Sequence, residues 1–317
     1  MKLGFALPYC GSWATPDNQL AVARRAEELG YASLWTAQRL LMPTEPVNEY
    51  YAAPGAPWPA VFRSVADPIV SLAFVAAATS RIRLGTATLV LPFHDPVLLA
   101  KQLATLDVLC RGRLDVGFSL GWSKDEYAAT GAPWARRGER FEEALACLKA
   151  AWGPQPASFA GEFFSLPGST VAPGPVQRPH PPMLIGGYSD IALRRAATLA
   201  DGYLGGNLPL ERIVPLLDRL RGFAEEAGRD PASLRLVSRG VVAASATPAG
   251  PDRRPLTGTY AEIEADVARY AAAGLDELFL DLNFDPRVGV PEADPAESLA
   301  RAMEVLERLA GFAAHAG

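Results

Sequence analysis

The sequence contains few of the residues that usually hold metal ions or form disulfide frameworks. Its three histidines are His94, His180 and His315. They are scattered, and no HExxH motif or Cys/His cluster is present, so we expect no catalytic metal. Its three cysteines are Cys10, Cys110 and Cys147. An odd number of cysteines at wide spacing is typical of reduced, buried thiols.

Other absences exclude classes of partner and reaction. No apolar stretch approaches the roughly 20 residues that span a bilayer. The net charge is −5 and no run of Lys or Arg forms a basic stripe, so we expect neither a membrane nor nucleic acid as a partner. With only four lysines, none at a late strand end, the sequence argues against a Schiff-base aldolase. The sequence contains neither a GxGxxG motif nor a Walker motif, so it supports neither a Rossmann dinucleotide site nor a P-loop. The N-terminus has no signal-peptide pattern, which favours a cytoplasmic location.

Strand-like runs alternate with helical patterns along all 317 residues. We predict eight strands, at Lys2–Leu7, Ser33–Thr36, Arg81–Leu89, Arg113–Phe118, Met183–Ile185, Gly202–Leu204, Leu234–Ala243 and Glu277–Leu282. Eight strand–helix units that close on themselves make an α/β protein of the (β/α)8 TIM-barrel type, here as one domain over residues 1–317. Two long insertions, Ala37–Ala66 after strand 2 and Gly153–Pro182 before strand 5, are expected to be lids or small excursions.

The helices between the strands have recognisable ends. Five Thr-Pro or Asp-Pro pairs place an N-cap residue before a proline at the first helical position. These pairs begin at Thr15, Asp67, Asp95, Asp230 and Asp294. Gly30 and Gly274 are predicted to end their helices just before a strand.

The active site of such a barrel lies where the strands end and the βα loops begin. Here the strand ends are apolar, aromatic and rich in glycine, which suits a flat apolar ligand with a phosphate tail. The turn at Gly186, Gly187, Tyr188 and Ser189 leads into a predicted helix, so free main-chain N–H groups and a hydroxyl converge as they would on a phosphate. The alternative is a plain βα turn in which Ser189 is only the N-cap.

Several sequence blocks occur in order along nearly the whole chain. They include KLGFALP, YASLWTAQRLLMP, RIRLGTATLVLPFHDPVLLAKQLATLDVLCRGRLDVGFSLGW, RGERFEEAL, PVQRPHPPMLIGGYS and DGYLGG. In these blocks the chain resembles the luciferase-like monooxygenase superfamily, and within it the branch that uses the deazaflavin coenzyme F-420.

The resemblance implies positions for a cofactor. In relatives the third strand carries a bulge with a non-proline cis peptide behind the ring, and the matching bond here joins Ala87 to Thr88. The turn from Gly186 to Ser189 matches the phosphate position of the family. The complete set of cofactor-binding residues that we predict is Ala87, Thr88, Leu120, Gly121, Gly186, Gly187, Tyr188, Ser189, Gly206 and Asn207. Enzymes of the FMN type have an arginine where this chain has Leu120, which favours F-420 over FMN.

Many relatives place a histidine after the second strand as an acid or base, and the matching positions here are Gln38 and Arg39. We predict these two as catalytic residues, although Arg39 stays charged near neutral pH and can act only electrostatically. The alternative for Arg39 is a salt bridge that anchors the lid. We predict the substrate pocket from the mouth aromatics and one charge within the seventh strand. These residues are Tyr9, Trp13, Trp58, Phe62, Trp122 and Arg239.

The residues named above are compatible with three functions. The first is hydride transfer between reduced F-420 and a small organic substrate. The second is an FMN-dependent monooxygenase that uses O2 and receives reduced FMN from a partner reductase, and the third is a non-catalytic flavin-binding barrel. We expect a homodimer, as is common among the relatives.

Overall fold

The computed structural model describes residues 1–250 and 252–314, so His315 lies outside the described residues. Eight parallel strands form a closed barrel in the order β1-β12-β9-β8-β7-β4-β3-β2. The barrel strands are β1 (Lys2–Ala6), β2 (Ser33–Thr36), β3 (Arg83–Val90), β4 (Leu114–Ser119), β7 (Met183–Ile185), β8 (Gly202–Gly205), β9 (Arg235–Val241) and β12 (Glu277–Asp281). The predicted (β/α)8 barrel is confirmed, and every predicted strand end lies within two residues of the observed one.

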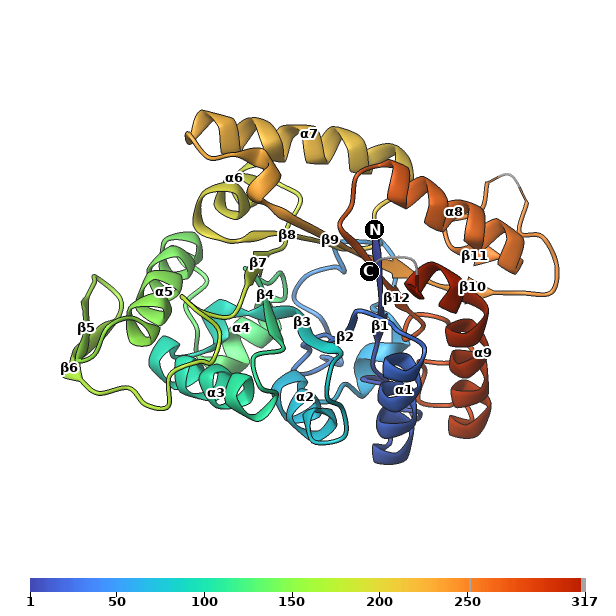
Figure 1. Ribbon diagram of the computed structural model, residues 1–317, viewed down its shortest axis with the longest axis horizontal. Helices are drawn as coiled ribbons and strands as arrows, with labels where there is room; N and C mark the ends of the chain where they lie inside the picture. The colour runs from blue at the N-terminus through green and yellow to red at the C-terminus, as the bar shows by residue number, and fades with distance from the viewer. Residues whose placement is uncertain (251, 315–317) are drawn as a thin grey trace.

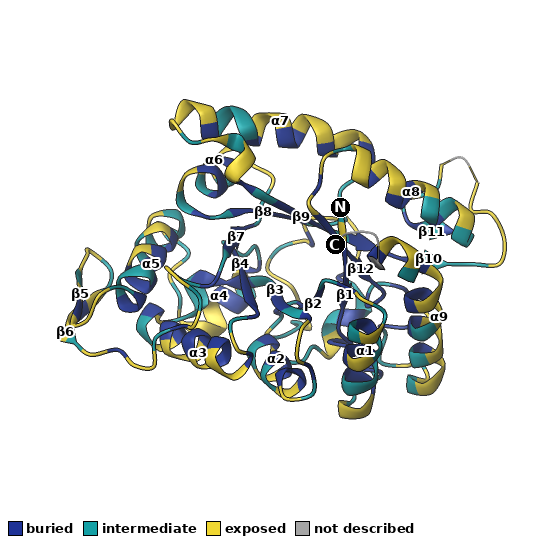
Figure 2. Cartoon of the chain, viewed as in Figure 1, coloured by how far each residue is buried: buried dark blue, intermediate teal, exposed yellow. Residues whose placement is uncertain are grey.

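Helices form an outer ring around the strands (Figure 1). They are α1 (Pro16–Glu28), α2 (Pro68–Ala76), α3 (Pro96–Leu109), α4 (Lys124–Thr130), α5 (Arg137–Trp152), α6 (Asp190–Leu199), α7 (Leu210–Glu226), α8 (Tyr260–Ala272) and α9 (Pro295–Ala314). Their inner faces and the barrel strands are buried while their outer faces are exposed, as Figure 2 shows. The core of the protein is therefore a helix–sheet layer around the barrel, together with the barrel interior.

The predicted helix ends are confirmed at all but one position. Thr15 caps α1 by accepting a hydrogen bond from the Asn18 N–H at 3.2 Å, and Asp67 and Asp95 cap α2 and α3 in the same way. The prediction at Asp230 was wrong in length, because the segment from Pro231 to Ser233 is only a short 3-10 turn. The next strand, β9, begins two residues later and leaves no room for a longer helix.

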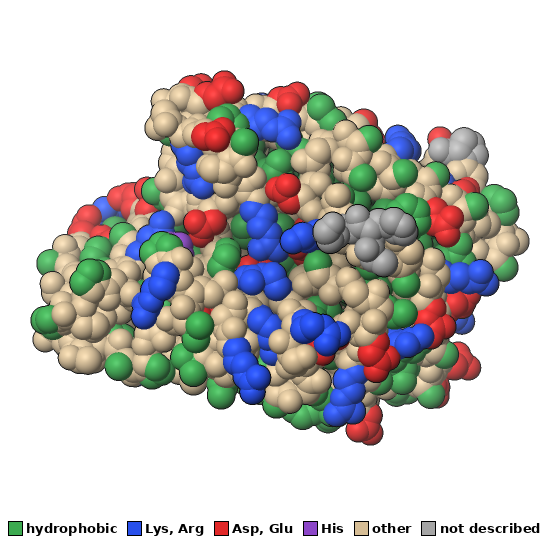
Figure 3. Space-filling view, viewed as in Figure 1, with side chains coloured by type: hydrophobic (Ala, Val, Ile, Leu, Met, Phe, Trp, Pro, Cys, Tyr) green, Lys and Arg blue, Asp and Glu red, His purple; other side chains and the backbone are tan. Residues whose placement is uncertain are grey.

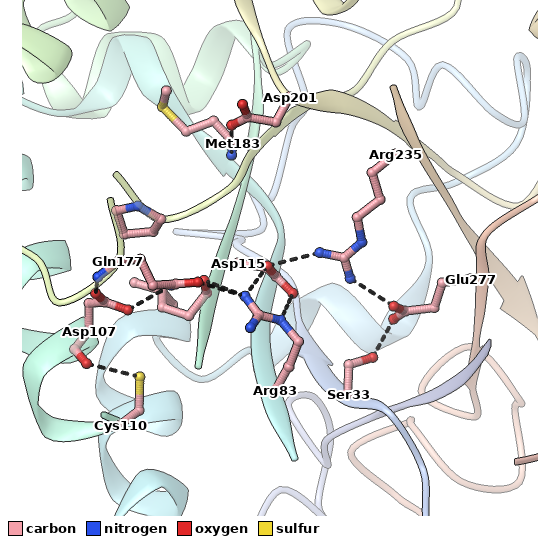
Figure 4. Close-up of polar contacts among 12 residues, drawn as sticks. Ser33, Arg83, Asp107, Cys110, Asp115, Gln177, Met183, Asp201, Arg235 and Glu277 are labelled. Carbon is pink, nitrogen blue, oxygen red and sulfur yellow. Dashed lines mark hydrogen bonds and ion pairs between the residues drawn. The ribbon is translucent and has the colours of Figure 1, made fainter. Parts of the chain in front are cut away.

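A polar network closes the end of the barrel where the strands begin (Figure 4). Asp115 on β4 pairs with Arg83 at 2.5 Å and with Arg235 at 2.9 Å. Arg235 also pairs with Glu277 at 2.8 Å, and Glu277 accepts a hydrogen bond from Ser33. Because these charged groups pair with one another, this end of the barrel is a closed polar network, and the site is sought at the opposite end.

An apolar layer lies above the polar network inside the barrel. The ring of Trp35 stacks on Phe279 with 5.2 Å between centroids, and Leu184, Leu204 and Val237 belong to the same buried cluster. A Cβ atom at Gly85 would collide with the Trp35 ring, so only glycine fits there. Because these two layers fill the interior above the strand starts, the cavity in the described residues opens at the carboxyl ends of the strands.

The two predicted insertions have structure of their own. The first contains the 3-10 helix η1 (Ala60–Arg63), and Cys10 in the loop after β1 bridges to Val65 near its end. The second contains an antiparallel pair, β5 (Ala157–Ala160) and β6 (Ser165–Ser169). A further short pair, β10 (Ala243–Ala244) with β11 (Thr257–Gly258), follows β9.

The remaining composition-based expectations concern surfaces and ligand clusters. All three cysteines are free and buried. In residues 1–250 and 252–314, no helix is long and apolar enough to cross a membrane, and no group of three or more His, Cys, Asp or Glu side chains could hold a metal ion. On the face drawn in Figure 3, Lys and Arg side chains are interspersed with Asp and Glu.

Candidate active site

A cavity of about 320 Å³ opens at the carboxyl ends of the barrel strands. Its volume lies in the usual range for a small-molecule or cofactor site. Fifteen of the eighteen predicted site residues line it. They are Tyr9, Gln38, Arg39, Phe62, Ala87, Thr88, Leu120, Gly121, Trp122, Gly186, Gly187, Tyr188, Ser189, Gly206 and Arg239.

Strand β3 forms one wall of the cavity. The peptide bond between Ala87 and Thr88 is cis, as predicted, and the pairing of β3 with β4 shifts register between Thr86 and Leu89. The Thr88 hydroxyl donates to Ser119 on β4 at 2.7 Å. The bulge thus presents a short stretch of small side chains and main chain to the cavity, against which a flat ring can lie.

The turn after β7 has the shape of an anion-binding site. Gly187 has a φ of +141°, and a Cβ atom there would lie 2.6 Å from the Cβ of Ala192. Ser189 caps α6 by accepting a hydrogen bond from the Ala192 N–H at 3.3 Å, so the plain N-cap role is also present. Because the hydroxyl acts as acceptor there, it can still donate to an oxygen of a ligand at the helix N-terminus.

Arg195 is a lining residue that the sequence analysis missed. It lies in the second turn of α6, and its guanidinium reaches back against Gly138 at the start of α5. The Arg195 Nε donates to the Glu142 Oε1 at 2.7 Å. The end of the cavity beside the Gly186–Ser189 turn therefore has one arginine, although Leu120 stands where the resemblance places an arginine in FMN-type enzymes. The available signal in the sequence was the position of Arg195 six residues after Ser189, in the helix predicted to follow the turn.

Gln38 is held on both sides by hydrogen bonds. Its Oε1 accepts from the Val90 N–H at 2.7 Å, and its Nε2 lies 3.1 Å from the Nε2 of His94. Since the amide can only donate to that ring nitrogen, His94 is the neutral tautomer with its proton on Nδ1. Burial lowers the pKa of His94, and nearby Asp67 opposes that shift. A histidine thus contacts Gln38. It comes from the loop after β3, whereas the histidine of many relatives follows the second strand.

Arg39 forms the lid anchor that was its alternative role. Its Nη2 lies 2.5 Å from the Glu126 Oε2 on α4, and the Leu40 N–H donates to the other carboxylate oxygen at 2.7 Å. The guanidinium also lies over the rings of Trp122 (4.7 Å) and Phe62 (5.2 Å). Burial lowers the pKa of Arg39, and the Glu126 carboxylate opposes that shift. Arg39 lines the cavity, but the Glu126 carboxylate largely neutralises its charge.

Arg239 points into the cavity from β9. Its Nη1 lies 3.7 Å from the Oδ2 of Asp281 on the neighbouring strand β12, and the guanidinium lies 4.7 Å from the Phe284 ring centroid. The Tyr9 hydroxyl donates to the same Asp281 oxygen at 2.8 Å, and the pKa of Tyr9 is raised well above its usual value, chiefly by burial and then by Asp281. Tyr9 is therefore a fixed hydrogen-bond donor.

Three predicted site residues do not line the cavity. Trp13 is fully buried in the helix–sheet core, where the Asn18 side-chain amide donates to the carbonyls of both Trp13 and Pro295 at the start of α9. Trp58 lies behind Trp122, with the two rings tilted by 59° and their centroids 4.5 Å apart, and its Nε1 donates to the Asn48 carbonyl. Asn207 accepts a hydrogen bond from the Val241 N–H and positions the end of β9. The structure thus places these side chains in support of the site.

The first insertion supplies aromatic walls that were not assigned from the sequence. Tyr50 and Tyr51 line the cavity and pack on Trp122, with centroids 5.3 and 5.6 Å away. Tyr51 also approaches Tyr188 at 6.5 Å, so the first insertion reaches the Gly186–Ser189 turn. Phe284, after β12, completes the wall opposite β3. The aromatic content of the insertion was visible in the sequence, but not which rings face inward.

The comparisons with known proteins agree with this geometry. A family model described as luciferase-like monooxygenase matches residues 1–277. The chain belongs to the luciferase-like monooxygenase family. An uncharacterised family member from Mycobacterium tuberculosis is 31% identical over 221 residues, 69% of this chain and 76% of its own length. The FMNH(2)-dependent dimethylsulfone monooxygenase of Pseudomonas putida is 37% identical over 155 residues, 48% of this chain and 42% of that protein.

Solved structures support the luciferase-like fold across the whole chain. The monooxygenase RslO1 from Streptomyces bottropensis superposes with a TM-score of 0.78 at 22% identity, covering 98% of both chains. An F-420-dependent secondary alcohol dehydrogenase superposes with a TM-score of 0.73 at 17% identity, covering 97% of this chain and 98% of that one. By sequence, the chain spans slightly under two thirds of the first mycobacterial relatives, at 66% of their length.

Proposed function

We propose that this family member is an oxidoreductase that binds coenzyme F-420 across the barrel mouth and transfers a hydride between it and a small organic substrate. The cofactor's ring would lie against Ala87 and Thr88 on β3, and its phosphate would lie at the turn from Gly186 to Ser189. When bound, the deazaflavin supplies the two-electron chemistry. The chain supplies position and a dry, aromatic cavity.

The charge at the phosphate end is the observation that carries the preference for F-420. That end has one arginine, Arg195, and its Nε already donates to Glu142. The phosphate of F-420 is a diester with a single negative charge, whereas a phosphate monoester such as that of FMN carries between −1.5 and −2 near neutral pH. One partly neutralised arginine beside main-chain N–H groups matches the smaller charge better.

Arg39 and Gln38 have different roles in this proposal. Arg39 holds the lid through Glu126 and carries positive charge beside the ring site. Gln38 holds the end of β3 through the Val90 N–H, and its contact with His94 fixes the orientation of the amide. Neither side chain releases a proton near neutral pH, so both position groups and stabilise charge rather than exchange protons.

Equilibrium titration tests the proposal directly. The purified protein is titrated with oxidised F-420 and separately with FMN, following the fluorescence of each cofactor. We expect saturable quenching with F-420 and an affinity at least tenfold higher than for FMN. Absence of saturable F-420 binding would overturn the proposal.

A second candidate function is that of the oxygenase component in a two-component system using reduced FMN and O2. It is favoured by the named relatives, since a flavin-dependent trigonelline monooxygenase of Acinetobacter baylyi, described as an oxygenase component, is 30% identical over 171 residues. In that case Arg195 would be the arginine that compensates for Leu120. Substrate-dependent O2 uptake with reduced FMN and a reductase, without turnover of F-420, would decide for it.

The remaining expectations belong to the same proposal. We propose that residues 1–317 act as one domain, in the cytoplasm and as a homodimer. A non-catalytic flavin-binding barrel is the outcome if either cofactor binds but a broad substrate screen shows no oxidation of the reduced cofactor.

A further inference from the structure

The cavity is lined by cationic side chains without lining carboxylates, as judged over the described residues. Its charged lining residues are Arg39, Arg195 and Arg239. Each has one carboxylate behind it, outside the lining. These pairs are Arg39 with Glu126, Arg195 with Glu142 and Arg239 with Asp281.

The three arginines differ in how completely they are satisfied. Arg39 donates a hydrogen bond to its carboxylate at 2.5 Å, although its Nε is buried without a partner in the described residues, and Arg195 donates to its carboxylate at 2.7 Å. Arg239 stays 3.7 Å from Asp281, beyond hydrogen-bond distance, and its Nε is buried without a partner in the described part of the chain. Only 15% of the Arg239 side chain is exposed, so solvent does little to satisfy these donors.

Asp281 is occupied by other groups. Its Oδ2 accepts from the Tyr9 hydroxyl at 2.8 Å, and its Oδ1 accepts from the N–H and the side-chain amide of Asn283 at 2.9 and 2.8 Å. The carboxylate therefore holds Arg239 by charge alone and leaves its N–H donors directed elsewhere. A buried guanidinium with free donors is costly unless a ligand supplies acceptors.

The position of Arg239 separates it from the cofactor's wall. In the closed barrel β9 lies four strands from β3 in either direction, so Arg239 stands directly opposite Ala87 and Thr88. The Gly186–Ser189 turn follows β7, which lies between β9 and β3 along one side of the barrel. A ring held on β3 with its tail toward β7 leaves its free face toward Arg239, with Phe284 and the lid tyrosines around it.

We propose that Arg239 is a specificity-determining residue that binds an anionic oxygen, such as a carboxylate, phenolate or enolate oxygen, of an otherwise aromatic or apolar substrate. The guanidinium supplies charge-assisted hydrogen bonds that Asp281 leaves free, and the aromatic walls receive the apolar body. The inference rests on the proposed function only in naming the bound anion a substrate. The anion site itself needs no cofactor.

A pair of probes that differ mainly in charge tests the site. Calorimetric titration compares 2-naphthoate with the neutral 2-naphthamide on the full-length protein. We expect the wild type to bind naphthoate at least tenfold more tightly, Arg239→Met to abolish that preference with little change for the amide, and Arg239→Lys to restore part of it. The matched control Arg63→Met, at an exposed arginine that does not line the cavity, should keep the preference.

The opposing outcomes are equally definite. Equal affinities for the two probes in the wild type, or no binding of naphthoate, would overturn the proposal. So would an unchanged preference in Arg239→Met, or a loss of the preference in the control Arg63→Met. If Arg239→Met does not fold, the wild-type preference and Arg239→Lys still decide. Failed F-420 binding with an intact naphthoate preference would remove the proposed function and leave the anion site standing.

Discussion

The Nη2 atom of Arg39 lies 2.5 Å from the Oε2 of Glu126, and both side chains are almost completely buried. The pair joins the first insertion to helix α4. The other Glu126 oxygen accepts from the Leu40 N–H, so one carboxylate holds both the side chain and the main chain of the lid. The charge pair therefore anchors the aromatic wall of the cavity to the barrel.

Replacing Arg39 by Met should strongly destabilise the protein. The substitution leaves the Glu126 carboxylate buried and without its cation, which typically costs about 3–5 kcal/mol. Urea denaturation measures the change in free energy of unfolding. The double variant Arg39→Met with Glu126→Gln should recover part of the loss, because the unpaired charge is gone.

The matched control is an exposed pair near the same segment. Arg63 and Glu292 pair at 2.9 Å, but their side chains are 56% and 67% exposed. Arg63→Met should change the free energy of unfolding by no more than about 1 kcal/mol. Equal effects at Arg39 and Arg63 would contradict the anchoring role of Arg39.

Replacing Arg195 by Met should weaken binding of the phosphate-bearing cofactor. A hydrogen bond to a charged group contributes about 1.5–3 kcal/mol, so we expect the Kd for F-420 to rise roughly 10- to 150-fold. Fluorescence titration measures it. The same deazaflavin without its phosphate should bind the variant and the wild type equally well. A parallel loss for both ligands would place Arg195 away from the phosphate.

Adding a methyl group at Gly187 should disrupt the phosphate turn. The backbone there has a φ of +141°, and the new Cβ would meet the Cβ of Ala192 at 2.6 Å, so the turn must shift. We expect Gly187→Ala to lower the affinity for F-420 at least tenfold. The control is Gly222→Ala in α7, where no atom lies within 4 Å. It should stabilise the helix by about 0.5–1 kcal/mol and leave F-420 affinity unchanged.

His94 should make the protein less stable in mild acid. Because burial lowers its pKa in the folded state, the unfolded chain binds the proton more tightly. The free energy of unfolding should therefore fall as pH drops below about 6.5, the ordinary histidine pKa, and stop falling because of His94 once pH passes the lowered folded-state value. Urea denaturation between pH 7.5 and 5.0 measures the slope.

The variant His94→Gln isolates this contribution. Glutamine keeps an acceptor for the Gln38 amide but does not titrate, and all carboxylates are common to both proteins. The variant should lose less stability between pH 7.5 and 5.0 than the wild type. Identical slopes would show that His94 titrates alike in the folded and unfolded states.

Local signals carried the prediction of the fold. Strand and helix periods, the proline-marked caps at Thr15 and Asp67 and the helix-ending glycines are properties of short segments, and all of these are present in the structure. Asp230 caps only a short 3-10 turn, because too few residues remain before β9 for a longer helix. The cis bond between Ala87 and Thr88 was predicted from the resemblance, because no local propensity favours a non-proline cis peptide.

The candidate site, like the fold, could be predicted only in part from the sequence. The sequence by itself determined the barrel, the family and the strand ends that carry most of the cavity residues, because in a parallel barrel every strand's carboxyl end must meet the others. Only the tertiary structure decided that Arg39 meets Glu126, that Arg195 lines the cavity and that Trp13 belongs to the core. These outcomes depend on loops without periodicity and on charges far apart in the chain, whose meeting is set by packing rather than by local pattern.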